Sequence, residues 1–194
     1  MLRGEVAGLR ARQVDDVQIL HAELYDDVAT RMRADSRPWR PIPPGSPSSP
    51  FALTEPSDEA AVFSVVLLDH LELAGEALLW AIDSHNRLAH IGISLRPRFR
   101  GHGLGADVVR LLCYYGFAVR GMHRLQIETM ADNAAMIAIA TGAGFTREGT
   151  LRGAAWVDGA FADEAIFGLL AAEWQERQHS ASHTPGGYPA GADS

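Results

Sequence analysis

The sequence predicts one α/β (α+β) domain built on a mixed sheet, and three observations support this prediction. Hydrophobic residues make up 47% of the 194 residues and charged residues 21%, so the chain can bury a sizeable core. Segments with helical spacing of apolar residues alternate with short segments rich in β-branched residues. Polar or glycine-containing turns separate these segments. Because helices and strands are interleaved, we expect a single domain at residues 1–177.

The N-terminal part of the chain predicts one helix followed by a loop. Residues 13–32 carry apolar side chains three or four positions apart, which is typical of one buried helical face. Residues 37–50 contain six prolines and can form neither a helix nor a central strand. The plain interpretation of this segment is a tethered surface loop, and the functional one is a lid or a wall of an acceptor site.

The rest of the chain predicts a sheet with two further helices. Strands are expected at residues 61–68, 71–82, 88–95, 124–130, 145–151 and 161–170, and helices at residues 103–119 and 133–141. Short polar turns connect the first three strands, which favours an antiparallel meander. Residues 178–194 are rich in Pro, Gly and Ser and are expected to form a disordered tail.

Composition excludes several classes of function. Acidic residues outnumber basic ones 24 to 17, so the net charge is −7 and sequence-independent nucleic-acid binding is not expected. All 17 basic residues are arginines, which excludes Schiff-base catalysis by lysine. Cys113 is the only cysteine, and no Cys/His cluster has metal-ligand spacing, so neither an internal disulfide nor a metal site is expected. Without a long apolar run or a signal-peptide pattern, a cytoplasmic location with no membrane contact is expected.

A glycine-rich segment between a predicted strand and a predicted helix indicates an anion site. It reads Arg100-Gly101-His102-Gly103-Leu104-Gly105, and its glycines let the backbone approach a ligand closely. Amides at the start of the following helix converge on the same point, and positive charge is added by Arg96, Arg98, Arg100 and His102. The spacing matches neither a dinucleotide fingerprint nor a P-loop, which needs lysine. The simpler alternative is a glycine-rich turn with no ligand.

Several ordered motifs give the sequence a family resemblance. The run from Ile91 to Pro97, with the segment from Arg100 to Gly105, resembles the acyl-CoA motif Q/R-x-x-G-x-G/A of the GNAT family of N-acetyltransferases. Asn133, with Gly144-Phe145 further on, resembles the N…GF segment of that family. Residues 144–164 resemble the RimJ/RimL-like subgroup. The likeness covers residues 71–174, around half of the chain.

The resemblance implies a mixed, mostly antiparallel sheet with splayed central strands, flanked by helices. It also implies acetyl-CoA as co-substrate and no metal. The backbones of Ile93, Ser94 and Leu95 would pair with the pantetheine arm, and the loop from Arg100 to Gly105 would hold the pyrophosphate. Asn133 would contact the pantetheine arm or the acyl carbonyl region, and a plain helix N-cap is the alternative for this residue.

The implied reaction is direct attack of an amine on the thioester carbonyl, which requires a base to take the proton of the amine. The family's usual tyrosine, serine and downstream acidic residue correspond to Ala140, Met136 and Ala155, so no acid or base can be carried over. His90 and Glu128 are the candidate catalytic residues, because imidazole titrates in the useful range and Glu128 lies on the next strand. The alternatives are a structural histidine and an ordinary surface carboxylate.

A few other residues have both a structural and a functional interpretation. Tyr25, Trp39 and Trp80 could line an acceptor pocket, although aromatic residues are more often in the core. Cys113 is interpreted as a packing residue of its helix.

The resulting functional prediction is an acetyl-CoA-dependent N-acetyltransferase that acts on a primary amine. The acceptor is a protein N-terminus or a small amine, and the negative net charge would attract a cationic acceptor. A homodimer through the last strands is a further expectation from the resemblance. The alternative function is a non-catalytic acyl-CoA-binding sensor or interaction module. A nucleotide-binding regulatory domain fits the glycines but not their spacing.

Overall fold

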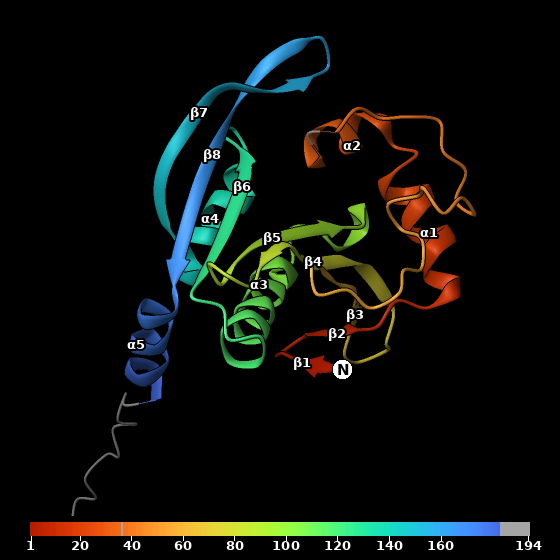
Figure 1. Cartoon of the computed structure of the whole chain (residues 1–194). Helices are drawn as coiled ribbons and strands as arrows, with labels where there is room; N and C mark the ends of the chain where they lie inside the picture. Colours follow the sequence, from red (N-terminus) through yellow and green to blue (C-terminus); the bar gives the residue numbers. More distant parts are fainter. Residues whose placement is uncertain (36, 183–194) are drawn as a thin grey trace, which may run out of the picture.

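An eight-stranded mixed sheet forms the centre of the molecule (Figure 1). The computed structural model describes residues 1–35 and 37–182. Strand order is β1-β2-β3-β4-β5-β6-β8-β7, and every neighbouring pair is antiparallel except β5 and β6. The strands are β1 (Leu2–Arg3), β2 (Ala7–Arg10), β3 (Ala61–Leu67), β4 (Leu73–Asp83), β5 (Leu88–Leu95), β6 (Arg124–Met130), β7 (Thr146–Val157) and β8 (Ala160–Leu170). The predicted fold class is confirmed.

Helices cover both faces of this sheet. They are α1 (Val14–Leu24), α2 (Val28–Ala34), α3 (Leu104–Tyr114), α4 (Ala134–Ala143) and α5 (Ala171–Ser182), with a 3-10 turn η1 (Pro97–Phe99) and a π-helical turn η2 (Tyr115–Val119) that continues α3. α3 and α4 pack together on one face, and their apolar side chains share a core with β5 and β6. α1 and the proline-rich segment lie on the other side, around the smaller cluster of Leu20, Tyr25 and Phe51. None of the helices within the described residues is long and apolar enough to cross a membrane.

The prediction of a single helix over residues 13–32 is wrong, because the helix ends at Leu24 and a second one begins at Val28. Asp27 is the N-cap of α2. Its carboxylate accepts hydrogen bonds from the amide and the hydroxyl of Thr30 at 3.2 and 2.6 Å. Aspartate favours this N-cap position over a helix interior. The apolar spacing continues across the break through Val28, which is why the sequence did not reveal it.

The two ends of the chain also differ from the prediction. The short strands β1 and β2 were not predicted, and they extend the sheet beyond β3. α5 runs to Ser182, so residues 178–182 are helical and do not belong to the disordered tail that the sequence predicts. The rest of that predicted tail, residues 183–194, lies outside the described residues.

The N-terminal strands are held by a carboxylate of α3. Asp107 is buried and accepts hydrogen bonds from the amides of Val6 and Ala7 at 2.9 and 2.8 Å. Burial by itself raises the pKa of Asp107, but these amide bonds outweigh it and hold the pKa below its ordinary value. The ionised carboxylate therefore stabilises the folded chain.

We expect Asp107→Ala to lower the free energy of unfolding by about 2–4 kcal/mol, because two buried amides lose their acceptor. Urea denaturation at pH 7 measures the loss, and Asp107→Asn, which keeps one acceptor oxygen, should lose less. Because the folded pKa is depressed, this stabilisation is present above the unfolded pKa and is lost as pH falls through the folded one. The difference between wild type and Asp107→Ala should therefore shrink in acid, and a pH-independent difference would contradict the charge assignment.

Candidate active site

The central strands part at the middle of the sheet. β5 and β6 pair only at Leu88–Arg124, Ala89–Leu125 and His90–Gln126, and no pairing follows His90. The remaining part of β5 pairs with β4 on one edge only, so its other edge is open. Ile93, Ser94 and Leu95 lie on this open, half-buried stretch, where the resemblance requires a splayed strand. An open strand edge offers backbone donors and acceptors to an extended ligand.

The glycine-rich loop lies between the end of β5 and the start of α3. Gly101 and Gly103 have φ values of +79° and +78°, a conformation that glycine adopts without strain. Both are exposed, and a Cβ atom at either position would meet nothing within 4 Å. Gly103 is the N-cap of α3, so the free amides of the first helical turn point out of the loop. This geometry fits a bound pyrophosphate.

The last two residues of this segment serve packing. Leu104 is 3% exposed and belongs to the core, so only its backbone can face a ligand. Gly105 is buried, and a Cβ atom there would come within 2.9 Å of Ile139 Cδ1. Gly105 is therefore the residue that lets α3 approach α4 closely.

The positive charge near the loop is smaller than the sequence suggested. Arg96 is buried, forms an ion pair with Glu23 of α1 and donates to the carbonyl of Leu73. Arg98 forms an ion pair with Glu72. Arg100 donates through Nε to the Leu95 carbonyl at 2.8 Å and stays exposed, as does His102. Arg100 is therefore the cation left to face an anion at the loop, with the exposed imidazole of His102 nearby.

Asn133 caps α4. Its Oδ1 accepts a hydrogen bond from the amide of Met136 at 3.2 Å, and its Nδ2 donates to Thr129 Oγ1 at 2.9 Å. The N-cap interpretation is thus confirmed. The contact with an acyl-CoA remains a prediction for the half-buried side chain.

His90 and Glu128 meet on the sheet face opposite α3 and α4. His90 Nδ1 lies 3.5 Å from Glu128 Oε1, and the imidazole stacks on Trp80 with 4.5 Å between ring centroids. Nδ1 is buried and has no hydrogen-bond partner. Burial lowers the pKa of His90, and the nearby charge of Glu128 offsets only part of this effect. A half-buried imidazole, held mainly in its neutral form and with Nδ1 against Glu128, therefore lies where β5 and β6 part.

A line of polar side chains along β6 fixes Glu128. Gln126 Nε2 donates to Glu128 Oε1 at 2.7 Å, and Gln126 Oε1 accepts from Arg124 Nη2 at 3.1 Å. Arg124 in turn pairs with Glu148 of β7. Alternate residues of a strand share one face, so the spacing of Arg124, Gln126 and Glu128 in the sequence is enough to predict that these side chains are neighbours.

Two further carboxylates on this face were missed by the sequence. Glu164 lies on the same face of β8 as Glu128 on β6, since Glu128 pairs with Ile166 and Met130 with Glu164. Burial and the charge of Glu128 raise the pKa of Glu164. Glu76 of β4 is opposite Ser94 of β5, and burial raises its pKa despite its ion pair with Arg12.

The residues that replace the family's usual acids and bases are unsuited to that role. Ala140 and Ala155 are buried, and the amide of Met136 is occupied by Asn133. Cys113 is 2% exposed, and burial raises the pKa of its thiol to about 12, so it is a packing residue. Within residues 1–35 and 37–182, no group of three or more His, Cys, Asp or Glu side chains is arranged to hold a metal ion.

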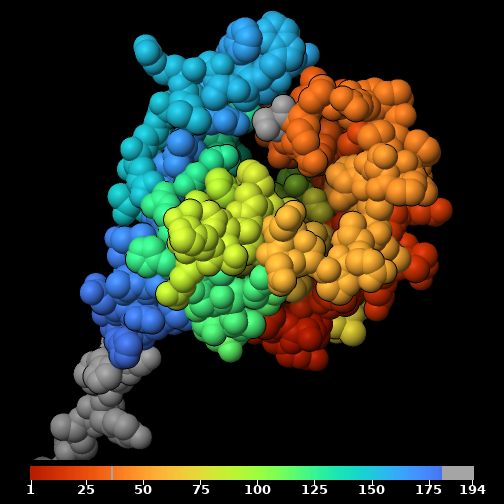
Figure 2. Space-filling view, in the orientation of Figure 1, coloured from red at the N-terminus to blue at the C-terminus, as the bar shows by residue number. Residues whose placement is uncertain are grey.

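The proline-rich segment is tied to α1. His21 Nδ1 lies 3.0 Å from Ser49 Oγ, and Trp39 Nε1 donates to the carbonyl of Tyr25 at 3.0 Å. Tyr25 belongs to the core, whereas Trp80 is 38% exposed. Figure 2 shows a hollow between this orange part of the chain and the yellow-green part that contains β5. Because one side of this hollow contains β5, the strand that carries His90, it is the candidate acceptor cleft.

Comparison with known proteins places this geometry in a family. The model of the acetyltransferase (GNAT) domain matches residues 8–146. The uncharacterized N-acetyltransferase p20 of Bacillus licheniformis is 28% identical over 116 residues, which are 60% of this chain and 65% of that protein. YdaF of Bacillus subtilis, named as a candidate ribosomal N-acetyltransferase, is 31% identical over 103 residues, or 53% of this chain and 56% of that protein. The chain thus spans less than two thirds of each relative.

A solved structure shares the fold. The spermidine N-acetyltransferase of Vibrio cholerae, in complex with CoA and spermine, has a TM-score of 0.71 at 18% identity, over 87% of this chain and 98% of that one. This degree of identity supports the fold alone. The family model covers well over half of the chain, including β5, the glycine loop and Asn133. The chain belongs to the GNAT acetyltransferase family.

Proposed function

We propose that this protein transfers an acetyl group from acetyl-CoA to a primary amine. The observation that carries the proposal is the open edge of β5 leading into the glycine loop, with His90 where β5 and β6 part. The backbone of residues 93–95 pairs with the pantetheine arm. The exposed loop residues Gly101, His102 and Gly103, with Arg100, hold the pyrophosphate.

His90 acts as the base of the reaction. An ammonium group cannot attack a thioester, so a base must first take its proton. The lowered pKa of His90 favours the neutral imidazole near pH 7, and its buried Nδ1 faces Glu128, so the rest of the half-buried ring takes the proton directly or through a water. Glu128 orients the imidazole and, with Glu164, attracts the cationic acceptor. A peptide N-terminus and a small amine both satisfy this requirement.

Thiol release from acetyl-CoA with a panel of amines tests the proposal. The panel contains N-terminal peptides, polyamines, aminoglycosides and amino acids. We expect at least one acceptor to raise the rate at least about tenfold over the rate without acceptor, since positioning alone gives much larger effects. The class of the best acceptor then separates a modifier of protein N-termini, as in the RimJ/RimL-like subgroup, from an enzyme of small amines.

An acyl-CoA sensor is the second candidate. The observation in its favour is the buried alanine at position 140, where the family's usual acid for the leaving thiolate stands. A sensor binds acetyl-CoA without consuming it. Binding by calorimetry, together with no release of thiol by any amine of the panel, would contradict the enzyme and favour the sensor.

A further inference from the structure

We propose that the acceptor cleft holds a second recognition site, formed by Arg31, Arg37 and Arg40, for a carboxylate group of the acceptor. The acceptor is then an amino acid-like compound or peptide that carries both an amine and a carboxylate. This inference rests on the proposed function, because it concerns the molecule that receives the acetyl group.

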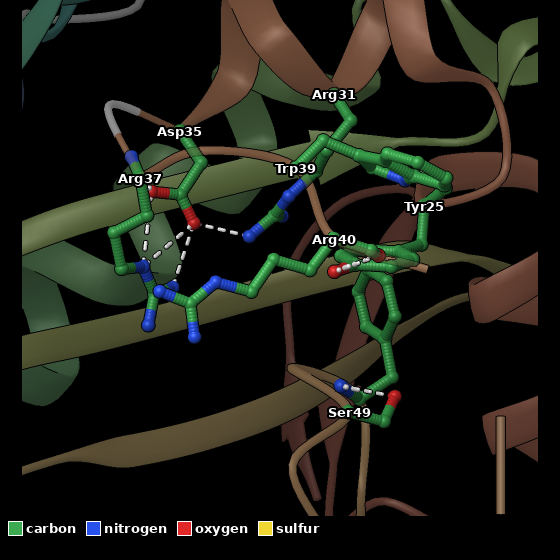
Figure 3. A network of polar contacts seen from close by, with 8 residues as sticks. Tyr25, Arg31, Asp35, Arg37, Trp39, Arg40 and Ser49 are labelled. Carbon is green, nitrogen blue, oxygen red and sulfur yellow. Dashed lines mark hydrogen bonds and ion pairs between the residues drawn. The ribbon is translucent and has the colours of Figure 1, made fainter. Parts of the chain in front are cut away.

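Two guanidinium groups pair with one carboxylate at the end of α2, and a third extends toward them. Asp35 forms an ion pair with the buried Arg31 and accepts hydrogen bonds from Arg37 Nε and Nη2 at 3.0 and 2.6 Å. Figure 3 shows the Arg40 side chain running in the direction of this pair. Within the described part of the chain, the Arg40 guanidinium has no hydrogen bond or ion pair, although its carbonyl accepts from Tyr25. Asp35 is therefore shared by two cations, and Arg40 brings a third cation to this part of the chain.

Glu76, the neighbouring carboxylate, does not neutralise the excess of positive charge. Glu76 is bonded by Arg12 at 2.5 Å, and the Arg12 side chain is only 5% exposed. Arg12 Nε is buried without a hydrogen-bond partner. Three arginines thus share Asp35 and Glu76, Arg40 adds a fourth cation, and burial favours the neutral form of Glu76. This local excess of positive charge stands out in a chain with a net charge of −7.

The cluster lies over the same sheet face as His90. The charges of Arg31 and Asp35 act on Glu76, and the charge of Glu76 acts on Arg37, so these groups are close together. Glu76 is opposite Ser94 on β5. His90 is four residues from Ser94 along the strand, a distance of about 13 Å.

The charged groups on this face lie on two sides of β5. Glu128 of β6 and Glu164 of β8 lie on one side, and Glu76, which is close to the arginine cluster, belongs to β4 on the other side. An ammonium group is attracted to the first and a carboxylate to the second. A planar guanidinium binds a carboxylate through two parallel hydrogen bonds, which the exposed Arg40 can offer, and Arg37, bonded to Asp35, adds positive charge. The arginine cluster repels a polycation that carries no carboxylate.

Matched acceptors test the site. We expect kcat/KM with 6-aminohexanoate to exceed that with 6-aminohexanamide at least about tenfold, the two differing only in the anionic group. The double variant Arg37→Gln, Arg40→Gln should lose this preference and leave KM for acetyl-CoA unchanged. Arg3→Gln, an exposed arginine of the edge strand β1, is the matched control and should keep the preference.

Each other outcome overturns the inference. Equal use of the acid and the amide by the wild type removes the carboxylate site. A higher KM for acetyl-CoA in the double variant assigns the arginines to the donor side instead.

If no amine is acetylated, the proposed function fails, and binding of glutarate to the CoA-saturated protein decides the site separately. Calorimetric binding that is lost in the double variant and kept in Arg3→Gln supports the site. Absence of binding to the wild type overturns it.

Discussion

Replacing Gly103 by glutamate is expected to lower the affinity for acetyl-CoA at least about 100-fold, equivalent to about 2.8 kcal/mol. Gly103 has a φ of +78°, which a side chain adopts only with strain. Its Cβ position is open, so the new carboxylate would extend into the loop proposed to hold the pyrophosphate. Two unit charges 4 Å apart repel by about 4 kcal/mol near a protein surface. Isothermal titration calorimetry measures the loss.

The matched control is Gly159→Glu. Gly159 has a φ of +82°, and a Cβ atom there also meets nothing within 4 Å, but it lies in the turn between β7 and β8. The control adds the same charge and the same backbone strain outside the loop, so acetyl-CoA affinity should stay within about twofold of wild type. Gly103→Ala adds strain without charge and should fall between the two. Wild-type affinity in Gly103→Glu would contradict the pyrophosphate site.

Local pattern predicted the elements that carry the donor site. β5 and β6 have the predicted bounds, because each is a short apolar segment limited by polar turns. The glycine loop followed by a helix is also where the sequence placed it, since positive φ values and a helix start leave a local signature. These features depend on neighbours along the chain, which is why one sequence is enough to find them.

Features that depend on contacts between distant residues could not be predicted. The ion pair of Arg96 with Glu23 joins residues 73 positions apart, and it removes a cation that the sequence had assigned to the loop. Glu76 and Glu164 share a face with His90 only because of strand register. The arginine cluster lies at the end of α2, which is a separate helix because α1 ends at Leu24. The regular spacing of apolar residues conceals this break.

Replacing His90 by glutamine is expected to lower kcat about 100-fold while the affinity for acetyl-CoA stays unchanged, as removal of a general base does. Burial lowers the pKa of His90, and Arg124 lowers it further, against the opposing charge of Glu128. The base is active when neutral, so kcat/KM should fall as pH drops through a midpoint below the ordinary histidine value of about 6.5. The variant should lose this acid limb of the pH profile.

Glu128→Gln is expected to shift the pH profile in a direction that a purely structural role of His90 would not produce. Removing the carboxylate takes away the charge that raises the pKa of His90, so the acid limb should move to lower pH. His85→Gln, an exposed histidine in the turn after β4, is the matched control and should leave rate and profile as in wild type. An acid limb that persists in His90→Gln would assign proton removal to another group. His90 would then be a packing residue that holds Trp80 at the point where the strands part.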